Sequence, residues 1–539
     1  MRGIAHAVLL AAIAAVVAPQ FEQSRDSIRE DHLHAHLRFL SHDHLAGRAP
    51  GTPGEEIAGE YIAAQFRRAG LRPVDGSYFQ DVALQGLTVD TSALALEFQR
   101  DTVMLRAAYP GDAVIWTGPG GNGTRDIEAE LVFVGYGVDA PEWDWDDFAE
   151  RDVRDRVLLF LIGDPPAPPE EPGLFDGRDL TYFGRWTYKL EEARRRGAAG
   201  ALIVHDDEAA GYGWEVVVSS WTGEQLHLDR SGGPDPLPLQ GWVRRETAQG
   251  ILAAASLDLD ELAVRAARRD FRPVPTGLTV HARIRSASRD VTTRNVVGLL
   301  PGKHPSRRDE IVVLTSHYDH LGTGAPVRGD SIYNGAYDNA SGVSLLLEVA
   351  EAFGMLQPPT DRSLLFIATA AEEAGLLGST YYTENPLFPL GSTVAALNTD
   401  GANLWGPTDD VIAIGADRST LGGILTARAH EMGLLVRDDP APERGSFFRS
   451  DHYPFARHGI PVLYLEHGLR FRGRPPGWGE QLMARYHAER YHRPGDEYDS
   501  RFDLSGAVQQ ARLLFAVGYD VANAASRPRP VANPAAAGR

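Results

Sequence analysis

Two adjacent acidic residues, Glu372 and Glu373, mark the position in this sequence with the clearest chemical potential. They follow an apolar run in the stretch LLFIATAAEEAGLLGS. Adjacent carboxylates repel one another, and burial would further disfavour their charged forms, so a cation is expected beside them. Neighbouring residues at a strand end point in different directions. One carboxylate can therefore bind a metal ion while the other faces a water molecule.

Four further stretches carry side chains that suit metal binding. His317 and Asp319, in SHYDHLG, point to the same side of an extended chain, so Asp319 can orient the imidazole ring of His317. Asp338 directly precedes a predicted helix and can present one oxygen to each of two metal ions. Asp400 ends another apolar run, and His492 lies in a YHRPGD turn. Each stretch alone also fits a polar loop, but together they indicate a two-metal hydrolytic site.

The composition restricts the ligands and the partners. The 539 residues include no cysteine, so a metal ion must be held by His, Asp and Glu. Such a ligand set suits zinc, with cobalt or manganese as alternatives. The net charge of −20, from 53 basic and 73 acidic residues, argues against a nucleic-acid partner.

Apolar strands that alternate with helices are expected to position these side chains. From Asn295 onward, the runs Val296–Leu300, Ile311–Thr315 and Leu364–Thr369 alternate with amphipathic helices such as Ser341–Leu356. Continuous apolar strands followed by helices indicate a mostly parallel sheet that is covered on both faces. The candidate side chains fall at the carboxyl ends of these strands, where open α/β sheets place their sites.

The N-terminal residues carry two other patterns. Residues 1–18 resemble a secretory signal peptide, which predicts a periplasmic or secreted protein without stable membrane insertion after signal removal. Residues 28–70 show helical periodicity. The five histidines between His32 and His44 scatter around that helix and are interpreted as a solvated surface.

The middle of the chain has a different residue pattern. Between about residues 110 and 285, short β-like runs alternate with loops that are rich in Gly and Pro. These runs are Leu131–Tyr136, Val157–Ile162, Ala201–Val204 and Val216–Ser219. They predict an inserted β-rich domain without a catalytic constellation of its own.

The chain resembles the M28 family of metallopeptidases, the co-catalytic dizinc aminopeptidases, in these motifs. The likeness includes Leu45–Gly54 and the region from Asn295 to Leu514, while Gly197–Val204 resembles a protease-associated (PA) domain. It implies an α/β fold with a mostly parallel or mixed sheet flanked by helices, of the zinc-peptidase, phosphorylase/hydrolase-like type. The expected parts are a signal peptide at 1–18, an N-terminal part of the peptidase domain at 25–110, an inserted PA-like domain at 111–285, an M28 catalytic domain at 290–525 and a disordered tail at 526–539.

The resemblance also implies a role for each candidate residue. It implies two Zn²⁺ ions, with His317 and Asp400 on one, Glu373 and His492 on the other, and Asp338 on both. Glu372 would be the general base and acid, and Asp319 would orient His317. Asp451 and His452, in an SDH stretch, would line the substrate pocket. His487 is a weaker competitor of His492.

The predicted function is the hydrolysis of N-terminal residues from peptides. A carboxypeptidase or dipeptidase of the same family is an alternative, because specificity lies in the pocket rather than in the metal ligands. The loops expected to build that pocket are Gly445–Phe448 and Gly468–Glu489. A non-catalytic protein that binds partners through the PA region and a single-metal cyclase acting on N-terminal glutamine are further alternatives. The sequence does not predict an oligomeric state.

Overall fold

The computed structural model describes residues 20–120, 122–149, 151–229 and 236–531, so the candidate signal peptide at 1–18 lies outside the described residues. Within these ranges, no helix has the length and apolar character needed to cross a membrane. The chain forms two compact units. Among the described residues, unit 1 comprises those within 20–82, 292–440 and 449–531, and unit 2 comprises those within 83–291 and 441–448. The expected domain limits at 111 and 285 both fall inside unit 2.

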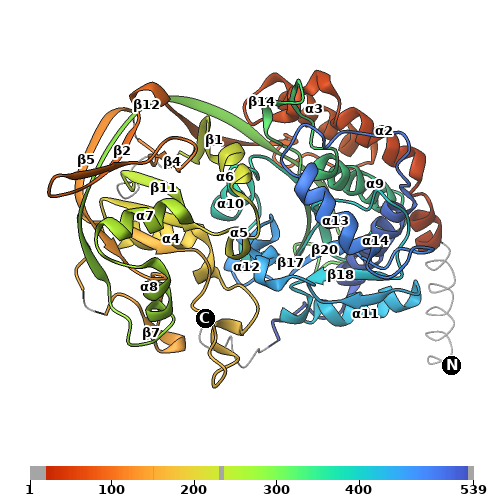
Figure 1. Ribbon diagram of the computed structural model, residues 1–539. Helices are drawn as coiled ribbons and strands as arrows, with labels where there is room; N and C mark the ends of the chain where they lie inside the picture. The colour runs from red at the N-terminus through yellow and green to blue at the C-terminus, as the bar shows by residue number, and fades with distance from the viewer. Residues whose placement is uncertain (1–19, 121, 150, 230–235, 532–539) are drawn as a thin grey trace, which may run out of the picture. The chain divides into compact units, whose positions relative to one another are not determined.

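Unit 1 is built on a mixed sheet with the strand order β19-β18-β20-β17-β13-β16-β12. Figure 1 labels β12, β17, β18 and β20 of these strands. Its central strands β20, β17, β13 and β16 are parallel to one another, whereas β12 and β18 pair antiparallel with their neighbours in that group. The strands are β12 (Val274–Leu300), β13 (Ile311–His317), β16 (Ser363–Thr369), β17 (Thr393–Asn398), β18 (Asp410–Ile414), β19 (Leu435–Arg437) and β20 (Val462–His467). This arrangement confirms the predicted α/β sheet.

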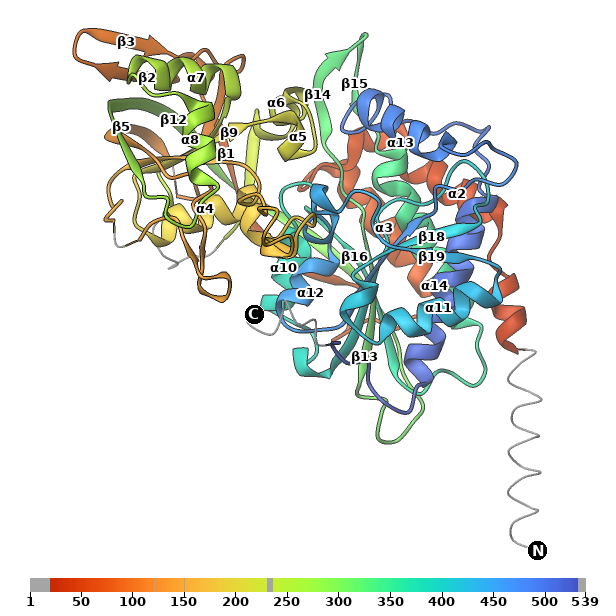
Figure 2. The same ribbon diagram turned by 60° about the horizontal axis from the view of Figure 1, so that its bottom comes forward.

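Helices cover both faces of this sheet, which explains why its central strands are buried throughout. Every residue of β13, β16 and β17 is buried. Figure 2 shows α12 on one side of the sheet and α11 and α14 on the other. The helices of unit 1 are α2 (Glu30–Leu40), α3 (Pro53–Arg68), α9 (Gly342–Gly354), α10 (Leu377–Glu384), α11 (Leu421–Glu431), α12 (His452–Arg457), α13 (Trp478–Glu489) and α14 (Ser505–Asn523).

Aromatic packing anchors α14, and we expect a large loss of stability when one of its rings is removed. The Phe515 ring is buried, with centroids 4.6 Å from Phe353 and 5.3 Å from Phe21. We expect Phe515→Ala to lower the free energy of unfolding by about 3–5 kcal/mol, because the cavity cannot fully collapse. Urea unfolding would measure this loss. Ile57→Ala, at a side chain that is 48% exposed, should change stability by no more than about 0.5 kcal/mol, and an equal loss in both variants would contradict the packing argument.

In unit 2 the strand order is β12-β5-β8-β9-β11-β4, and β5, β8, β9 and β11 are parallel. Helices α7 (Arg245–Ala254) and α8 (Leu259–Ala266) share one apolar cluster with this sheet, and α4 (Trp186–Arg195) and α6 (Trp214–Trp221) share another. The strands of unit 2 are β1 (Phe79–Val89, shared with unit 1), β2 (Ala95–Arg100), β3 (Val103–Arg106), β4 (Ala113–Trp116), β5 (Gly123–Phe133), β6 (Asp139–Ala140), β7 (Trp145–Asp146), β8 (Val157–Leu161), β9 (Gly200–His205), β10 (Glu224–Leu228) and β11 (Leu239–Arg244).

One expected strand of unit 2 is wrong. Val216–Ser219 was predicted to be extended because it is rich in valine, but it lies in the helix α6. Trp214 and Val217, three residues apart, are its buried positions, so helical spacing delivers both side chains to the core. Tertiary packing therefore outweighs the β-propensity of the valines.

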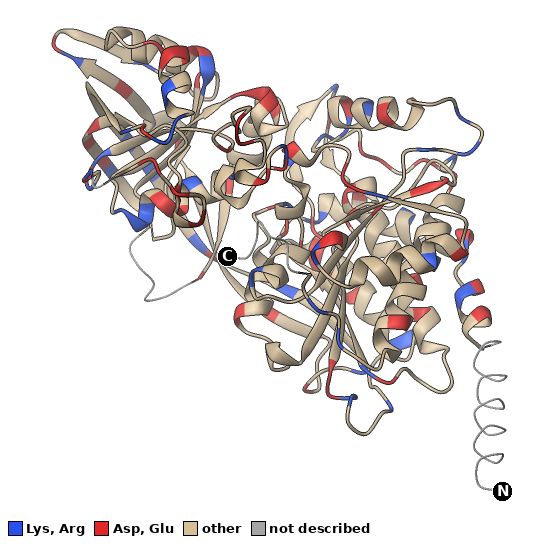
Figure 3. Cartoon of the chain, turned by 90° about the horizontal axis from the view of Figure 1, so that it is seen from below, with Lys and Arg blue, Asp and Glu red and all other residues tan. Residues whose placement is uncertain are grey.

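The charged residues are interspersed rather than segregated by sign. Figure 3 shows Asp and Glu residues alongside Lys and Arg residues in both units. A net charge of −20 favours solubility through repulsion between molecules.

Candidate metal centre

Three adjacent parallel strands of unit 1 bring the first group of candidate side chains together. His317 is the last residue of β13, Glu372 follows β16, and Asp400 follows β17. Because β16 and β17 flank β13, their carboxyl ends meet at one edge. The Nε2 atom of His317 lies 3.1 Å from Oδ1 of Asp400 and 3.9 Å from Oε2 of Glu372.

A second group lies beside the first and shares Asp338 with it. Asp338 is in the turn that precedes α9, and His492 follows α13 with a left-handed backbone (φ 54°). Nε2 of His492 lies 3.0 Å from Oε2 of Glu373 and 3.6 Å from Oδ2 of Asp338. The other oxygen of Asp338, Oδ1, lies 3.3 Å from Nε2 of His317. Asp338 thus presents one carboxylate oxygen to each histidine.

The donor atoms have the spacing that tetrahedral metal coordination needs. Bonds of about 2.0–2.2 Å from zinc to nitrogen and oxygen place neighbouring ligand atoms about 3.3–3.5 Å apart. The four His–carboxylate separations around Asp338, from 3.0 to 3.6 Å, bracket that spacing. The groups His317, Glu372, Asp400 and His320, Asp338, Glu373 each place three ligand atoms within 4.8 Å of one another. The residues present therefore fit a pair of metal ions.

The two neighbouring glutamates have opposite electrostatic environments. Burial raises the pKa of Glu372 well above its usual value, and the charges of Asp400 and Glu373 add to that effect. Burial also opposes ionisation of Glu373, but His492 and His320 outweigh it and lower the pKa to about 2. A pair of carboxylates whose pKa values are pushed apart is the arrangement that separates a proton carrier from a permanent anion.

The histidines and Asp338 complete this charge pattern. Burial lowers the pKa of His492, but the charges of Glu373 and Asp338 outweigh burial and raise it to about 10. For His317, Asp400 and Glu372 likewise outweigh burial and raise the pKa well above its usual range. Burial disfavours the charged form of Asp338, yet its contacts with His317 and His492 hold the pKa well below its usual value.

Asp319 lies behind the site and holds its main chain. Its side chain is fully buried, and its two carboxylate oxygens accept hydrogen bonds from the backbone N–H groups of Glu372 and Glu373, at 3.1 and 3.3 Å. Nδ1 of His317 lies 3.3 Å from the backbone carbonyl oxygen of Asp319 and 3.7 Å from its Oδ1. Asp319 therefore connects His317 to both glutamates.

Replacement of Asp319 tests this connection. In Asp319→Asn, the amide NH₂ would face one of two backbone N–H donors, and that glutamate would lose its anchor. We expect zinc affinity, measured by competition with a chelator, to fall about 10–100-fold, as for other residues that support metal ligands. Asp309→Asn, at a side chain that is 90% exposed, is the matched control. An unchanged zinc affinity in Asp319→Asn would exclude the supporting role.

Three further residues of the site were not assigned roles from the sequence. Nδ1 of His320 lies 2.6 Å from Oε1 of Glu373. The carboxylate of Asp496 accepts hydrogen bonds from the backbone N–H groups of Tyr337 and Asp338, at 3.0 Å from each nitrogen. His320 lies within the motif HYDH and Asp496 within the motif YHRPGD, so the sequence offered a signal for both residues.

Arg48 is the third of these residues, and it is fully buried beneath the site. Its guanidinium donates hydrogen bonds to the backbone carbonyl oxygens of Tyr318, Asn334 and Gly335, which flank the ligand turns. Burial lowers its pKa to about 10, and the carboxylates of Asp319 and Asp496 oppose that decrease. Arg48 thus places one buried positive charge behind the acidic cluster.

The two pocket candidates Asp451 and His452 are buried within unit 1. Asp451 accepts hydrogen bonds from the hydroxyl groups of Thr369 and Ser379, and burial raises its pKa to about 6. The ring of His452 packs 5.1 Å from that of Tyr464. These contacts anchor the start of α12 against β16, and a role in the substrate pocket stays a prediction.

The neighbouring loops differ in their placement. Ser450 donates a 2.7 Å hydrogen bond to Oδ2 of Asp400, opposite the oxygen that faces His317. His487 lies on an exposed part of α13 with Nδ1 2.8 Å from the carbonyl oxygen of Met483, so His492 is the histidine that faces Glu373. Of the two expected pocket loops, residues 445–448 belong to unit 2.

Comparison with known proteins finds a family model that matches part of this chain. Residues 295–517 match the family model of Peptidase family M28. Aminopeptidase YwaD of Bacillus subtilis (strain 168) is 37% identical over 94 residues, which cover 17% of this chain and 18% of that protein. A probable glutamate carboxypeptidase of Arthroderma benhamiae is 37% identical over 123 residues, covering 22% of this chain and 15% of that protein. The matched stretches thus span less than a fifth of either relative.

A solved structure extends the likeness to nearly the whole chain at the level of the fold. The aminopeptidase from Aneurinibacillus sp. strain AM-1 superposes with a TM-score of 0.55 and 20% sequence identity. The superposition covers 95% of this chain and 97% of that one. At this identity the likeness concerns the fold alone.

Proposed function

Because residues 295–517 carry a peptidase family M28 domain, we propose that this protein is a zinc-dependent exopeptidase that releases N-terminal residues from peptides. One observation carries the proposal: Asp338 presents its two oxygens to His317 and His492, each of which also faces a second carboxylate. This arrangement suits two zinc ions that share Asp338. The names of the similar proteins, an aminopeptidase and a carboxypeptidase among them, support a peptide substrate.

The proposed roles follow from the geometry. Two bound zinc ions would supply a water of lowered pKa and polarise the carbonyl group of the scissile bond. Glu373 and Asp400 would complete the two ligand sets. Glu372, whose side chain is 10% exposed, would act as the carboxylate, taking a proton from the attacking water and giving it to the leaving amine. Asp319 and Asp496 would hold the main chain of Glu372, Glu373 and Asp338 in place.

Export from the cell forms part of the proposal. The apolar stretch from Val8 to Ala18 follows a single early arginine, Arg2, as in secretory signals. N-terminal sequencing of the protein recovered from outside the cytoplasm would show a start after this stretch. Recovery only from the cytoplasm, with Met1 and Arg2 retained, would contradict export.

The activity is tested with matched substrates. Purified full-length protein is assayed on free and N-acetylated aminoacyl-nitroanilides, with and without a chelator and with zinc restored. We expect cleavage of the free-amine substrates only, loss of cleavage with the chelator and recovery with zinc. Cleavage confined to peptides with free C-termini would replace this proposal with a carboxypeptidase. Cyclisation of N-terminal glutamine without release of a free amino acid would identify a cyclase, and binding without turnover of any peptide would overturn the enzymatic proposal.

A further inference from the structure

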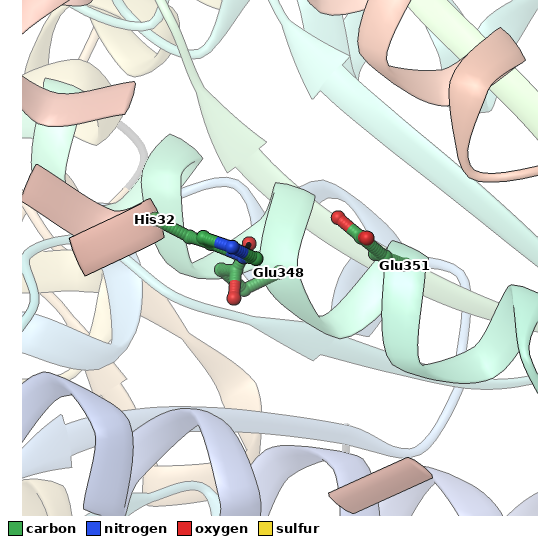
Figure 4. Close-up of side chains that lie close together, drawn as sticks. All are labelled: His32, Glu348 and Glu351. Carbon is green, nitrogen blue, oxygen red and sulfur yellow. Dashed lines mark ion pairs between the residues drawn. The ribbon is translucent and has the colours of Figure 1, made fainter. Parts of the chain in front are cut away.

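A second cluster of potential metal ligands lies between α2 and α9, apart from the residues of the candidate metal centre. His32 and His36 are on α2, whereas Glu348 and Glu351 are on α9. Figure 4 shows His32 reaching from α2 to Glu348, with Glu351 farther along α9. One ligand atom each from His32, Glu348 and Glu351 lie within 4.8 Å of one another. Three potential ligands therefore meet at one helix–helix contact, and His36 faces one of them, Glu348.

Glu348 is the centre of this cluster, and its environment is unusual for a carboxylate. Its side chain is 2% exposed. Oε2 accepts a 3.1 Å hydrogen bond from the backbone N–H of Arg29, which fixes the orientation of the group. Oε1 faces Nδ1 of His32 at 3.3 Å and Nε2 of His36 at 3.6 Å. Among the described residues, neither Oε1 of Glu348 nor the buried Nδ1 of His32 takes part in a hydrogen bond.

These separations fit a shared cation better than they fit hydrogen bonds. An N–H···O hydrogen bond in a protein spans about 2.9 Å. Neighbouring ligand atoms around tetrahedral zinc lie about 3.3–3.5 Å apart. The two separations at Glu348 are therefore long for hydrogen bonds and near the zinc spacing, as are those around Asp338.

The two histidines both face Glu348. They are four residues apart on α2 and therefore share one face of the helix, which turns both imidazoles toward Oε1 of Glu348. The other ring nitrogen of His36, Nδ1, lies 2.9 Å from the hydroxyl group of Tyr61. When Tyr61 accepts the Nδ1 proton, Nε2 directs a lone pair toward Glu348, as a metal-binding histidine requires. The interpretation of the His32–His44 histidines as a solvated surface is thus wrong for His36, which is 5% exposed.

We propose that His32, Glu348 and Glu351 bind one Zn²⁺ ion between α2 and α9, with His36, which faces the same oxygen of Glu348, as the nearest further donor. Glu351 also forms an ion pair with Arg68, and a water molecule can complete the coordination. The bound ion would link α2 to α9 and so stabilise the folded state. Because α9 begins directly after the turn that carries Asp338, this ion would hold the helix behind the candidate metal centre.

The zinc content of the protein tests the proposal directly, without depending on enzymatic activity. Full-length protein is stripped with a chelator, saturated with zinc, freed of excess zinc and analysed for zinc per chain. We expect His32→Asn to bind one ion fewer than the wild type. His34→Asn is the matched control, because His34 lies on the same helix but contacts Tyr498 instead, and it should keep the wild-type count. The difference of one ion is expected whether the other site holds two ions, one or none.

A stability measurement complements the count. Zinc should raise the Tm of the wild type and of His34→Asn further than that of His32→Asn, because the ion binds the folded state. Glu348→Gln should behave like His32→Asn, and circular dichroism of both variants verifies that they fold. If His32→Asn retains the wild-type zinc count, or if His34→Asn loses an ion equally, the proposal is overturned in favour of a histidine–carboxylate ion pair without a metal.

Discussion

Glu372→Gln is expected to lower kcat by about 10²–10⁴-fold while the zinc content of the protein stays unchanged. The amide cannot take up a proton from the attacking water, although it has nearly the size of the carboxyl group. Glu372 is farther from its histidine, at 3.9 Å, than Asp400, Glu373 and Asp338 are from theirs. Its loss should therefore affect the proton transfer rather than the binding of the ions.

The adjacent residue supplies the control for this result. Glu373→Gln removes a carboxylate that lies 3.0 Å from His492, so we expect loss of zinc together with loss of activity. Steady-state kinetics and elemental analysis on both variants separate the two effects. Activity of Glu372→Gln near the wild-type level would refute its assignment as the general base. Loss of zinc from Glu372→Gln would instead make it a ligand.

Asp338→Ala is expected to have the largest effect on metal content, because one side chain serves both candidate ion positions. Removing it withdraws one oxygen that lies 3.3 Å from His317 and another that lies 3.6 Å from His492. Residues that merely support metal ligands contribute about 10–100-fold to affinity, so a shared ligand should contribute more than about 100-fold. We expect weakened binding of both ions and no detectable turnover at zinc concentrations that saturate the wild type.

A variant beside Asp338 distinguishes its ligand role from a structural one. Asp496→Asn leaves the Asp338 carboxylate in place but weakens the hydrogen bonds that hold its backbone. We expect a loss of zinc affinity of about 10–100-fold that higher zinc concentrations restore. For both variants, competition with a chelator measures the zinc affinity, and assays over a range of zinc concentrations measure the recovery of activity. Loss of only one ion from Asp338→Ala, with the other bound at wild-type affinity, would contradict the shared role.

The central strands of unit 1 were predictable because the apolar pattern that specifies each strand is local in the sequence. The runs Ile311–Thr315 and Leu364–Thr369 are apolar at every position except the final threonine, and such runs indicate strands covered on both faces. They correspond to β13 and β16, and the helix expected at Ser341–Leu356 corresponds to α9. Since functional groups in open α/β sheets gather at carboxyl strand ends, the convergence of His317 and Glu372 was also a reasonable expectation.

What the sequence could not predict depends on contacts between distant segments. The carboxylate of Asp319 lies behind both glutamates 53 and 54 residues later, and Asp496 reaches Asp338 across 158 residues. Periodicity contains no information about such pairs. Similarly, His36 was interpreted as solvated because α2 alone gives no sign that Glu348, more than 300 residues later, packs against it.

Local propensity also failed where packing opposed it. The valines of Val216–Ser219 favour a strand, but the burial of Trp214 and Val217 on one face favours α6. The boundary of unit 2 was displaced for a related reason. β1 pairs with β10 and with β12, so the chain from Ala83 already packs with unit 2 before the change in texture near residue 110.

Anomalous X-ray diffraction at the zinc edge, from crystals of the zinc-saturated protein, tests the central claim most directly. The claim is that Asp338 lies between two ions, one beside His317 and Asp400 and the other beside Glu373 and His492. We predict two peaks about 3.5–4 Å apart, each about 2.0–2.2 Å from an oxygen of Asp338. A single peak among these residues, or none, would contradict the shared two-ion centre and with it the proposed mechanism.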